Sequence, residues 1–148
     1  MDKEISEKIP KILLRALGST YTLYFASHIA HWNVEGQNFT QLHAIFKDIY
    51  DDAFATIDEI GEKIRQYDVK IPSTFQEIMD SSAIKASEEP YTKQLLELHE
   101  KLKEQWDSIA VVADAAEDSS TVDMAGKRAG VHSKFAWMLR SLLKENNS

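Results

Sequence analysis

Apolar residues that repeat every three or four positions constrain this chain more than any other feature of its sequence. The repeat runs through four long stretches, and only five glycines and three prolines interrupt the 148 residues. A helix with such a stripe must bury it against another element. Four of them, joined by short turns and one longer connection, make a four-helix bundle. The sequence therefore predicts an all-α fold.

The breaks between the stripes give the expected boundaries. Residues 68–89 are too polar and too often interrupted for a main helix, so we expect a long connection there with one short helix inside it. The expected helices run from Pro10 (in the first turn) to Asn33–Val34, from Phe39–Thr40 (capped by Asn38) to Tyr67–Asp68, from the capping box Ser73-Thr-Phe-Gln76 to Met79, from Pro90 to the break at Ala115-Ala116, and from a cap at Ser119 or Ser120 to about Lys144.

Length and composition indicate a single domain, residues 1–148, with a sizeable core. There is no cysteine, which excludes disulfides, thiolate zinc sites and cysteine nucleophiles and leaves histidines and carboxylates as the strong ligands. No apolar run approaches the ~18–20 residues that span a bilayer, and the N-terminus has no apolar stretch of signal length. We expect a soluble cytoplasmic protein that makes no membrane contact.

The net charge of −7 at pH 7 bears on possible partners. Proteins that bind nucleic acid usually carry a basic stripe or tail. Here even the longest basic clusters, such as Lys101-Leu-Lys103 and Lys127-Arg128, are short. The N-terminal lysines alternate with acids, and the C-terminus ends in Lys144-Glu-Asn-Asn-Ser148. Neutralisation of phosphates would be weak at physiological salt, so we expect no strong DNA binding.

Potential metal ligands concentrate between His31 and Glu62. On the second helix His43, Lys47, Asp58 and Glu62 project from one continuous face, because their offsets place them within about 100° of one another. His43 and Glu62 are nevertheless about 28 Å apart along the helix. One helix cannot close a metal site from both ends, whereas two antiparallel copies bring the histidine end of one chain to the carboxylate end of the other.

The same stretch carries a family resemblance. The motif H-W-N-V-x-G-x-x-F-x-x-L-H from His31, followed by Asp58-x-x-x-Glu62, resembles the Dps family of miniferritins. The similarity continues more loosely through Thr121–Asp123 and His132–Arg140. It implies a ferritin-like four-helix bundle with a short extra helix between the second and third long helices. It also implies a hollow homo-oligomer, a dodecamer built from dimers.

The function implied by the resemblance is iron storage with ferroxidase activity. Fe(II) would be oxidised by H2O2 or O2 at sites shared between two subunits, and ferric iron would be stored in the cavity, which protects against oxidative damage. Each site would hold two irons, with no catalytic residue beyond the ligands and no other cofactor. The implied metal ligands are His31 and His43 of one chain and Asp58 and Glu62 of its partner.

These histidines and acids allow two other interpretations: residues with no metal, and a metal site inside one bundle. Taken singly, each histidine is more typical of a core or surface residue, and Asp58 and Glu62 of a solvated face. The common ferritin-like plan uses Glu-x-x-His pairs inside one bundle. The positions three residues before His43, His99 and His132 hold Thr, Leu and Ala instead. A di-iron site in this chain would therefore not be the usual one inside the bundle.

Lys47 departs from the family pattern, in which an aspartate at this position completes the iron ligation. A protonated ammonium has no acceptor and repels a dication. Lys47 has three possible states: paired with Asp51 one turn on, deprotonated by burial, or bound to Asp58 and Glu62 in place of iron. The alternative function is then a structural or binding shell with a degenerate site that has no ferroxidase activity.

Four more residues near the motif carry expectations. Asp51 and His28 could substitute as ligands, whereas Asp48 projects about 140° from His43 and could not. Trp32 is most simply an interface or core aromatic, and the resemblance implies that it intercepts radicals beside the iron.

Acids at the start of the fourth helix allow two interpretations. Glu117, Asp118 and Asp123 could simply favour the positive end of the helix dipole. The resemblance implies instead that acids here, Asp118 and Asp123 above all, line the pores through which iron passes at threefold axes.

Overall fold

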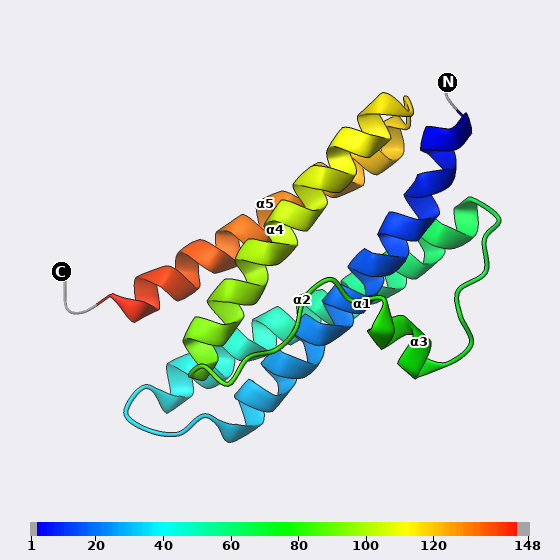
Figure 1. The fold of residues 1–148 in the computed structure, drawn as a ribbon. Coiled ribbons are helices and arrows are strands. Elements are labelled where there is room, and N and C mark those ends of the chain that lie inside the picture. The colour runs from blue at the N-terminus through cyan, green and yellow to red at the C-terminus, as the bar shows by residue number, and fades with distance from the viewer. Residues whose placement is uncertain (1–2, 145–148) are drawn as a thin grey trace.

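The computed structural model describes residues 3–144 and is helical in every regular element of that range. Four long helices pack side by side, and a short one lies in the connection between the second and the third (Figure 1). The prediction of an all-α bundle with a short extra helix is confirmed. The helices are α1 (Lys3–Asn33), α2 (Phe39–Gln66), α3 (Phe75–Asp80), α4 (Tyr91–Ala115) and α5 (Ser119–Leu143).

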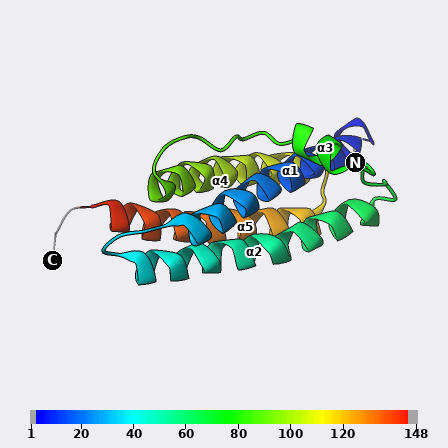
Figure 2. The ribbon, with the colours of Figure 1, turned by 90° about the horizontal axis from the view of Figure 1, so that it is seen from below.

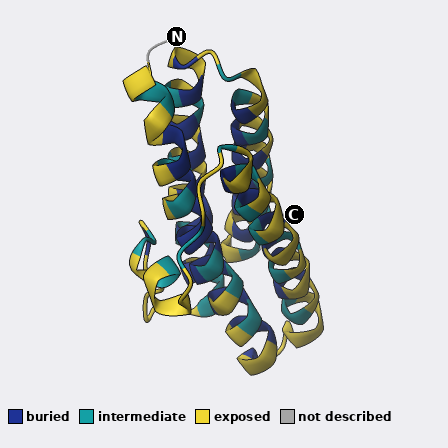
Figure 3. Cartoon of the chain, turned by 90° about the vertical axis from the view of Figure 1, so that its right-hand side faces the viewer, coloured by how far each residue is buried: buried dark blue, intermediate teal, exposed yellow. Residues whose placement is uncertain are grey.

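The bundle consists of two antiparallel helix pairs. α1 packs along α2, α4 packs along α5, and α1 also contacts α4. Figure 2 shows the four long helices running side by side in roughly the same direction, with α3 beside α1. Each long helix buries one face and exposes the other, as Figure 3 shows by colour. This is the amphipathic pattern that the apolar stripes predicted.

Two helix starts differ from expectation. α1 begins at Lys3, so the prediction that Pro10 lies in its first turn is wrong. Ile9 is fully buried and Ile5 packs against the same core cluster, and this burial outweighs the hydrogen bond lost at Pro10. The cap of α5 is Asp118, whose side chain accepts a hydrogen bond from the backbone N–H of Thr121, and not a serine.

Two further caps were only partly predicted. The short helix α3 is capped by Thr74, which accepts a hydrogen bond from the backbone N–H of Glu77. The capping box is therefore shifted by one residue from the one expected at Ser73. Asn38 precedes α2 as expected, but its side chain makes no capping hydrogen bond.

The core has two apolar clusters with a polar layer between them. One cluster centres on Phe46 and Leu98, and the other on Trp106 and Ile64. Between the clusters lie buried polar residues from all four long helices, among them Thr20, Thr56, His99, Arg128 and His132.

No helix in residues 3–144 combines the length and the apolar character that a membrane span requires.

Gly18 sets the distance between α1 and α3. A Cβ atom at this position would lie 2.6 Å from the carbonyl oxygen of Ile78 and 2.7 Å from both Ser81 Oγ and Ser82 N. In sequence Gly18 is only a weak point in a helix. In the structure it is the place where the α3 backbone rests on α1.

Replacing Gly18 by alanine should therefore destabilise the fold. The added methyl must push the α3 backbone away, and we expect the free energy of unfolding to fall by about 1–3 kcal/mol in urea or thermal denaturation. Gly130→Ala is the matched control, because nothing lies within 4 Å of its added Cβ. It should stabilise α5 by up to about 1 kcal/mol through helix propensity. Equal effects at the two positions would contradict the close approach.

Candidate metal centre

His31 and His43 bind each other's backbone across the turn between α1 and α2. The Nδ1 atom of His31 lies 2.7 Å from the carbonyl oxygen of His43, and the Nδ1 atom of His43 lies 2.7 Å from the carbonyl oxygen of His31. Gly36, with φ of +109°, gives the backbone the left-handed conformation that lets this turn close. The spacing of twelve between the histidines thus places them opposite each other.

These contacts fix the proton on each imidazole. A carbonyl oxygen only accepts, so Nδ1 of each ring must carry the hydrogen and donate it. Each Nε2 atom then has a free lone pair. Histidines that bind metals usually have this arrangement, with the other ring nitrogen donating to a carbonyl or carboxylate. Both rings are therefore set up to bind a cation through Nε2.

The two imidazole rings are stacked. Their centroids are 3.7 Å apart and their planes differ by 15°. A metal ion lies close to the plane of the ring that binds it, about 2 Å from the nitrogen. An ion shared by two stacked rings would lie far out of both planes. A cation bound by Nε2 of His31 would therefore lie at a different position from one bound by Nε2 of His43.

Aromatic side chains surround the histidine pair. The ring of Tyr50 is 5.1 Å from that of His31 and 4.4 Å from that of His28. His28 also lies 3.9 Å from Trp32, measured between ring centroids, and Trp32 is 63% exposed. His28 is thus held between two aromatic rings one turn before His31. Trp32 is a surface residue here and not a core aromatic.

Lys47 pairs with Asp51 in this chain. Its ammonium lies 2.6 Å from a carboxylate oxygen of Asp51, and both side chains are half-exposed. The hydrogen bond and the negative charge of Asp51 raise the pKa of Lys47 above its ordinary value. This is the first of the three predicted states, and deprotonation by burial is wrong. Whether Lys47 reaches a partner's acids stays a prediction.

Asp58 and Glu62 lie at the other end of α2. Both are exposed, one turn apart, and they line a shallow depression with Tyr21 and Arg65. α2 is continuous from Phe39 to Gln66, so about 28 Å of helix separates His43 from Glu62. Within residues 3–144 of one chain, no three histidine or carboxylate side chains come together as a metal site. The structure brings His31 to His43 and Asp58 to Glu62, but not one pair to the other.

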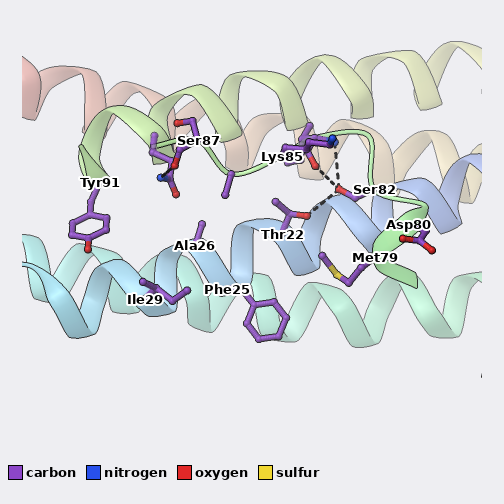
Figure 4. Close-up of a pocket in the computed structure, with 13 residues that line it drawn as sticks. Thr22, Phe25, Ala26, Ile29, Met79, Asp80, Ser82, Lys85, Ser87 and Tyr91 are labelled. Atoms are coloured by element: carbon purple, nitrogen blue, oxygen red, sulfur yellow. Dashed lines mark hydrogen bonds between the residues drawn. The ribbon is translucent and has the colours of Figure 1, made fainter. Parts of the chain in front are cut away.

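Exposed aromatic and apolar residues lie between the histidine pair, His31 and His43, and the acid pair, Asp58 and Glu62. Phe25 and Ile29 on α1 and Phe54 on α2 are 41%, 44% and 64% exposed. Ring contacts join Phe25 and Phe54 to Tyr24, and Tyr24 to His28. A cavity of about 760 Å³ opens beside Phe25 and Ile29 under the connection that carries α3 (Figure 4). Exposed apolar residues that gather on one side of a protein in this way often mark a surface that another molecule covers.

Comparison with known proteins identifies the fold. A family model described as "Ferritin-like domain" matches residues 10–147. The chain belongs to the ferritin-like family. It is 29% identical to the DNA protection during starvation protein of Brevibacillus brevis, over 97% of this chain and all of that protein. It is 26% identical to DNA protection during starvation protein 2 of Bacillus anthracis, over 95% and 100%.

Solved structures assign it to one branch of that family. A Dps protein from Bacillus brevis superposes with a TM-score of 0.91 at 27% identity, covering 97% of this chain and all of that one. Dps from Vibrio cholerae gives 0.89 at 26% identity, covering 97% and 94%. The latter is described as a member of a broad superfamily of ferritin-like diiron-carboxylate proteins. Our chain is a Dps-type miniferritin.

The interior of this miniferritin holds a polar network that the sequence did not reveal. Arg128 on α5 donates two hydrogen bonds to Asp52 on α2, at 3.1 and 2.8 Å. The same guanidinium lies 3.3 Å from Nε2 of His132, whose Nδ1 is 3.0 Å from Nδ1 of His99. Arg128 and His132 are one turn apart on an otherwise apolar face, which was the available signal.

The direction of each hydrogen bond in this network follows from Arg128. A guanidinium only donates, so Nε2 of His132 accepts and its Nδ1 carries the hydrogen. His132 then donates to His99, whose remaining hydrogen is on Nε2 and has no partner among the described residues. Burial, and then the positive charge of Arg128, lower the pKa of His99 to about 3. Burial and the neighbouring His99 and Arg128 lower that of His132 well below 6.5.

The acids expected at pores have different environments. Asp118 accepts hydrogen bonds from Tyr67, Ser120 and the backbone of Thr121. Burial alone would raise the pKa of Asp118, but these hydrogen bonds outweigh it and lower the pKa. Burial and the bond to Asp118 raise the pKa of Tyr67 to about 12. Asp118 is thus a cap and an anchor for Tyr67, whereas Asp123 is exposed. A pore role for either stays a prediction.

The buried histidines predict an acid-sensitive fold. The unfolded chain binds protons on His99 and His132 below pH 6.5, whereas the folded chain keeps both neutral. The free energy of unfolding therefore has its full contribution from these two histidines above pH 6.5, and it falls as the pH drops from 6.5 towards 4. The expected slope is about 1.4 kcal/mol per pH unit for each histidine, measured by denaturant unfolding.

Two variants test this assignment. His132→Gln should lower stability at pH 7.5 and flatten the slope between pH 6.5 and 4, because one buried imidazole is gone. Gly130→Ala changes no titratable group and meets no neighbour within 4 Å, so it should keep the wild-type slope. An unchanged slope in His132→Gln would contradict the assignment.

Proposed function

We propose that this protein binds Fe(II) at sites shared between two subunits, oxidises it with H2O2 or O2 and stores the ferric product in a hollow oligomer. His31 and His43 supply the nitrogen ligands, and Asp58 and Glu62 of the partner subunit supply the oxygen ligands. The observation that carries this proposal is the histidine pair, in which both Nδ1 atoms are bound to carbonyls and neither Nε2 atom has a hydrogen bond from residues 3–144. Imidazole and carboxylate together suit iron.

The surface between the two half-sites supports a twofold dimer. An isologous interface places each patch against its own copy, so the patch must contain both halves of the site. We call the exposed side of the α1/α2 pair, which carries Phe25, Ile29 and Phe54, the α1/α2 face. The histidines lie at one end of this face and the acids at the other, and Phe54 is exposed between them. Rotation about an axis near Phe54 brings the histidine half of each chain to the acid half of the other. Burial of the exposed aromatics supplies the driving force.

Two cation positions suit a two-electron oxidation. Two ferrous ions each lose one electron, and one peroxide takes both electrons and two protons to give two waters, so no hydroxyl radical is released. The parallel rings of His31 and His43 support two irons per site, because each ring addresses its own ion. Storage of the ferric product in a dodecameric shell then removes both reagents of radical chemistry.

Lys47 favours a second candidate, a shell without ferroxidase activity. In that reading the ammonium of Lys47 turns from Asp51 to the partner's Asp58 and Glu62 and takes the place of iron. The pairing of Lys47 with Asp51 at 2.6 Å supports the active site over this alternative, because it leaves the partner's acids available.

Mixed oligomers test the sharing of the site. A variant with His31→Ala and His43→Ala, and one with Asp58→Ala and Glu62→Ala, should each lose peroxide-dependent Fe(II) oxidation. Co-expressed, they should recover about one quarter of the wild-type rate, since half the dimers are mixed and each has one intact site of two. The rate is measured by ferric absorbance under anaerobic Fe(II) loading.

The control for this experiment pairs two variants of one half. Co-expression of His31→Ala with His43→Ala cannot rebuild a complete histidine pair in any dimer, so the rate should stay at background. Failure of the first mixture to recover, with intact dimers present, would contradict a shared site.

DNA binding is a separate question for this chain. The relatives are named for DNA protection, but this chain carries a net charge of −7. Its termini, residues 1–2 and 145–148, lie outside the described residues. We expect no mobility shift of duplex DNA at physiological salt and at most a weak one at low salt. Retardation that persists at physiological salt would contradict this expectation.

A further inference from the structure

The cavity beside α1 is separate from the candidate metal centre. Its volume of about 760 Å³ falls in the range of about 300–1,000 Å³ that is usual for small-molecule sites. Its walls come from α1, from the connection that carries α3 and from the first turn of α4 (Figure 4). The four predicted metal ligands, His31, His43, Asp58 and Glu62, are not among the residues that line it.

Most of the cavity wall is apolar. Six side chains from the three segments supply it: Phe25, Ala26, Ile29, Met79, Ile84 and Tyr91. Figure 4 shows Tyr91 at one end of the cavity and Met79 towards the other. Asp80 and Lys85 also line it, but they are exposed and carry opposite charges. The wall therefore suits an uncharged apolar body, which gains affinity by burial, and has no net charge to select an ion.

Gln94 adds a fixed hydrogen-bond acceptor to this wall. The residue is 8% exposed, and its Nε2 donates to the carbonyl oxygen of Ser87. Because a carbonyl only accepts, this bond decides which end of the amide is the nitrogen. Oε1 is the other end, and it accepts no hydrogen bond from residues 3–144. A buried acceptor without a donor costs free energy, so a molecule that brings an N–H or O–H group to it gains affinity.

Two hydroxyl groups of the wall are bonded in a way that agrees with this preference. The hydroxyl oxygens of Thr22 and Ser82 are 3.0 Å apart. The carbonyl oxygen of Gly18 lies 3.2 Å from that of Thr22, and the carbonyl oxygen of Ile84 lies 2.8 Å from that of Ser82. Both hydroxyl hydrogens thus have acceptors within the chain, and the oxygens keep lone pairs. These hydroxyls, like Oε1 of Gln94, favour a ligand that donates.

We propose that this cavity binds a small, uncharged aromatic molecule that carries a hydrogen-bond donor. Its N–H or O–H group binds Oε1 of Gln94, and its ring packs against Phe25, Ile29 and Ile84. The inference goes beyond the proposed function and does not depend on it, because the cavity uses none of the iron ligands. Phe25 and Ile29 also belong to the α1/α2 face, so the bound molecule lies at the edge of that face.

Indole and 1-methylindole test the polar contact. The two molecules share one ring system, but only indole has an N–H donor, because a methyl group replaces that hydrogen in 1-methylindole. The assembled wild-type protein is titrated with each, and binding is followed by nuclear magnetic resonance. We expect indole, which has few non-hydrogen atoms, to bind with a Kd of about 1 mM. It should bind at least about fivefold more tightly than 1-methylindole, which leaves Oε1 of Gln94 unpaired.

The methionines report where the ligand binds. Met79 lines the cavity, whereas Met138 lines a groove between α2 and α5, and Met124 packs against the core cluster of Trp106. In protein labelled with 13C at the methionine methyl groups, the ring current of a bound aromatic molecule shifts the resonance of a nearby methyl. The Met79 signal, assigned with Met79→Leu, should shift with indole and saturate. The signals of Met124 and Met138 should stay in place.

Gln94→Met removes the acceptor and keeps the length of the side chain. Its affinity for indole should fall to that for 1-methylindole, which itself should change little. Gln105→Met is the matched control, because it makes the same exchange on the same helix at a residue that lines a different depression, with Arg15 and Ser108. It should keep the fivefold difference between the two ligands. If Gln94→Met does not assemble, the comparison of the two ligands on the wild type decides.

Three results would overturn the proposal. Equal affinities of the wild type for the two ligands would remove the contact with Gln94. A Met79 signal that does not shift up to the solubility limit of indole, or a shift at Met138 in its place, would remove the site. A crystal structure of the assembled protein in which side chains of the partner subunit fill the cavity would do the same. The variant His31→Ala/His43→Ala should bind indole as the wild type does, which separates this site from the metal centre.

Discussion

The exchange of hydrogen bonds between His31 and His43 organises the end of the bundle where the candidate chemistry lies. Each imidazole donates to the backbone carbonyl of the other residue, so the last turn of α1 is held to the first turn of α2. The contacts also decide which nitrogen of each ring is free, and the stacking decides that the two free nitrogens face separate positions. Structure and chemistry thus depend on the same pair of contacts.

The centre of the bundle follows a different plan from that of di-iron bundles with ligands inside. There the interior polar residues are Glu-x-x-His pairs around metal. Here the guanidinium of Arg128 supplies the interior cation, Asp52 supplies its counter-charge, and His132 and His99 continue the hydrogen-bond chain. Two neutral imidazoles and one ion pair complete a polar layer between apolar clusters. The interior is filled, and the free ligands are on the α1/α2 face.

The sequence predicted the fold well because its information is local. Apolar spacing gave the four long helices, and the motif from His31 to His43 gave the turn that pairs them. Errors arose where distant contacts decide: burial of Ile9 extends α1 past Pro10, and Asp118 caps α5 while also holding Tyr67. The Arg128–Asp52 pair joins residues far apart in the chain, so no local pattern indicates it. The departure at Lys47 was visible in the sequence, but its pairing with Asp51 could be read only from the side-chain geometry.

The unbroken length of α2 has a consequence for the life of a newly made chain. Its rigid rise keeps the imidazole half and the acid half apart in a lone subunit, and no bending of a loop can bring them together. Under the proposed function, a subunit that has folded but not yet met its counterpart cannot turn over iron and peroxide on its own surface. Oxidation of iron would begin only when subunits associate into the oligomer that stores the ferric product.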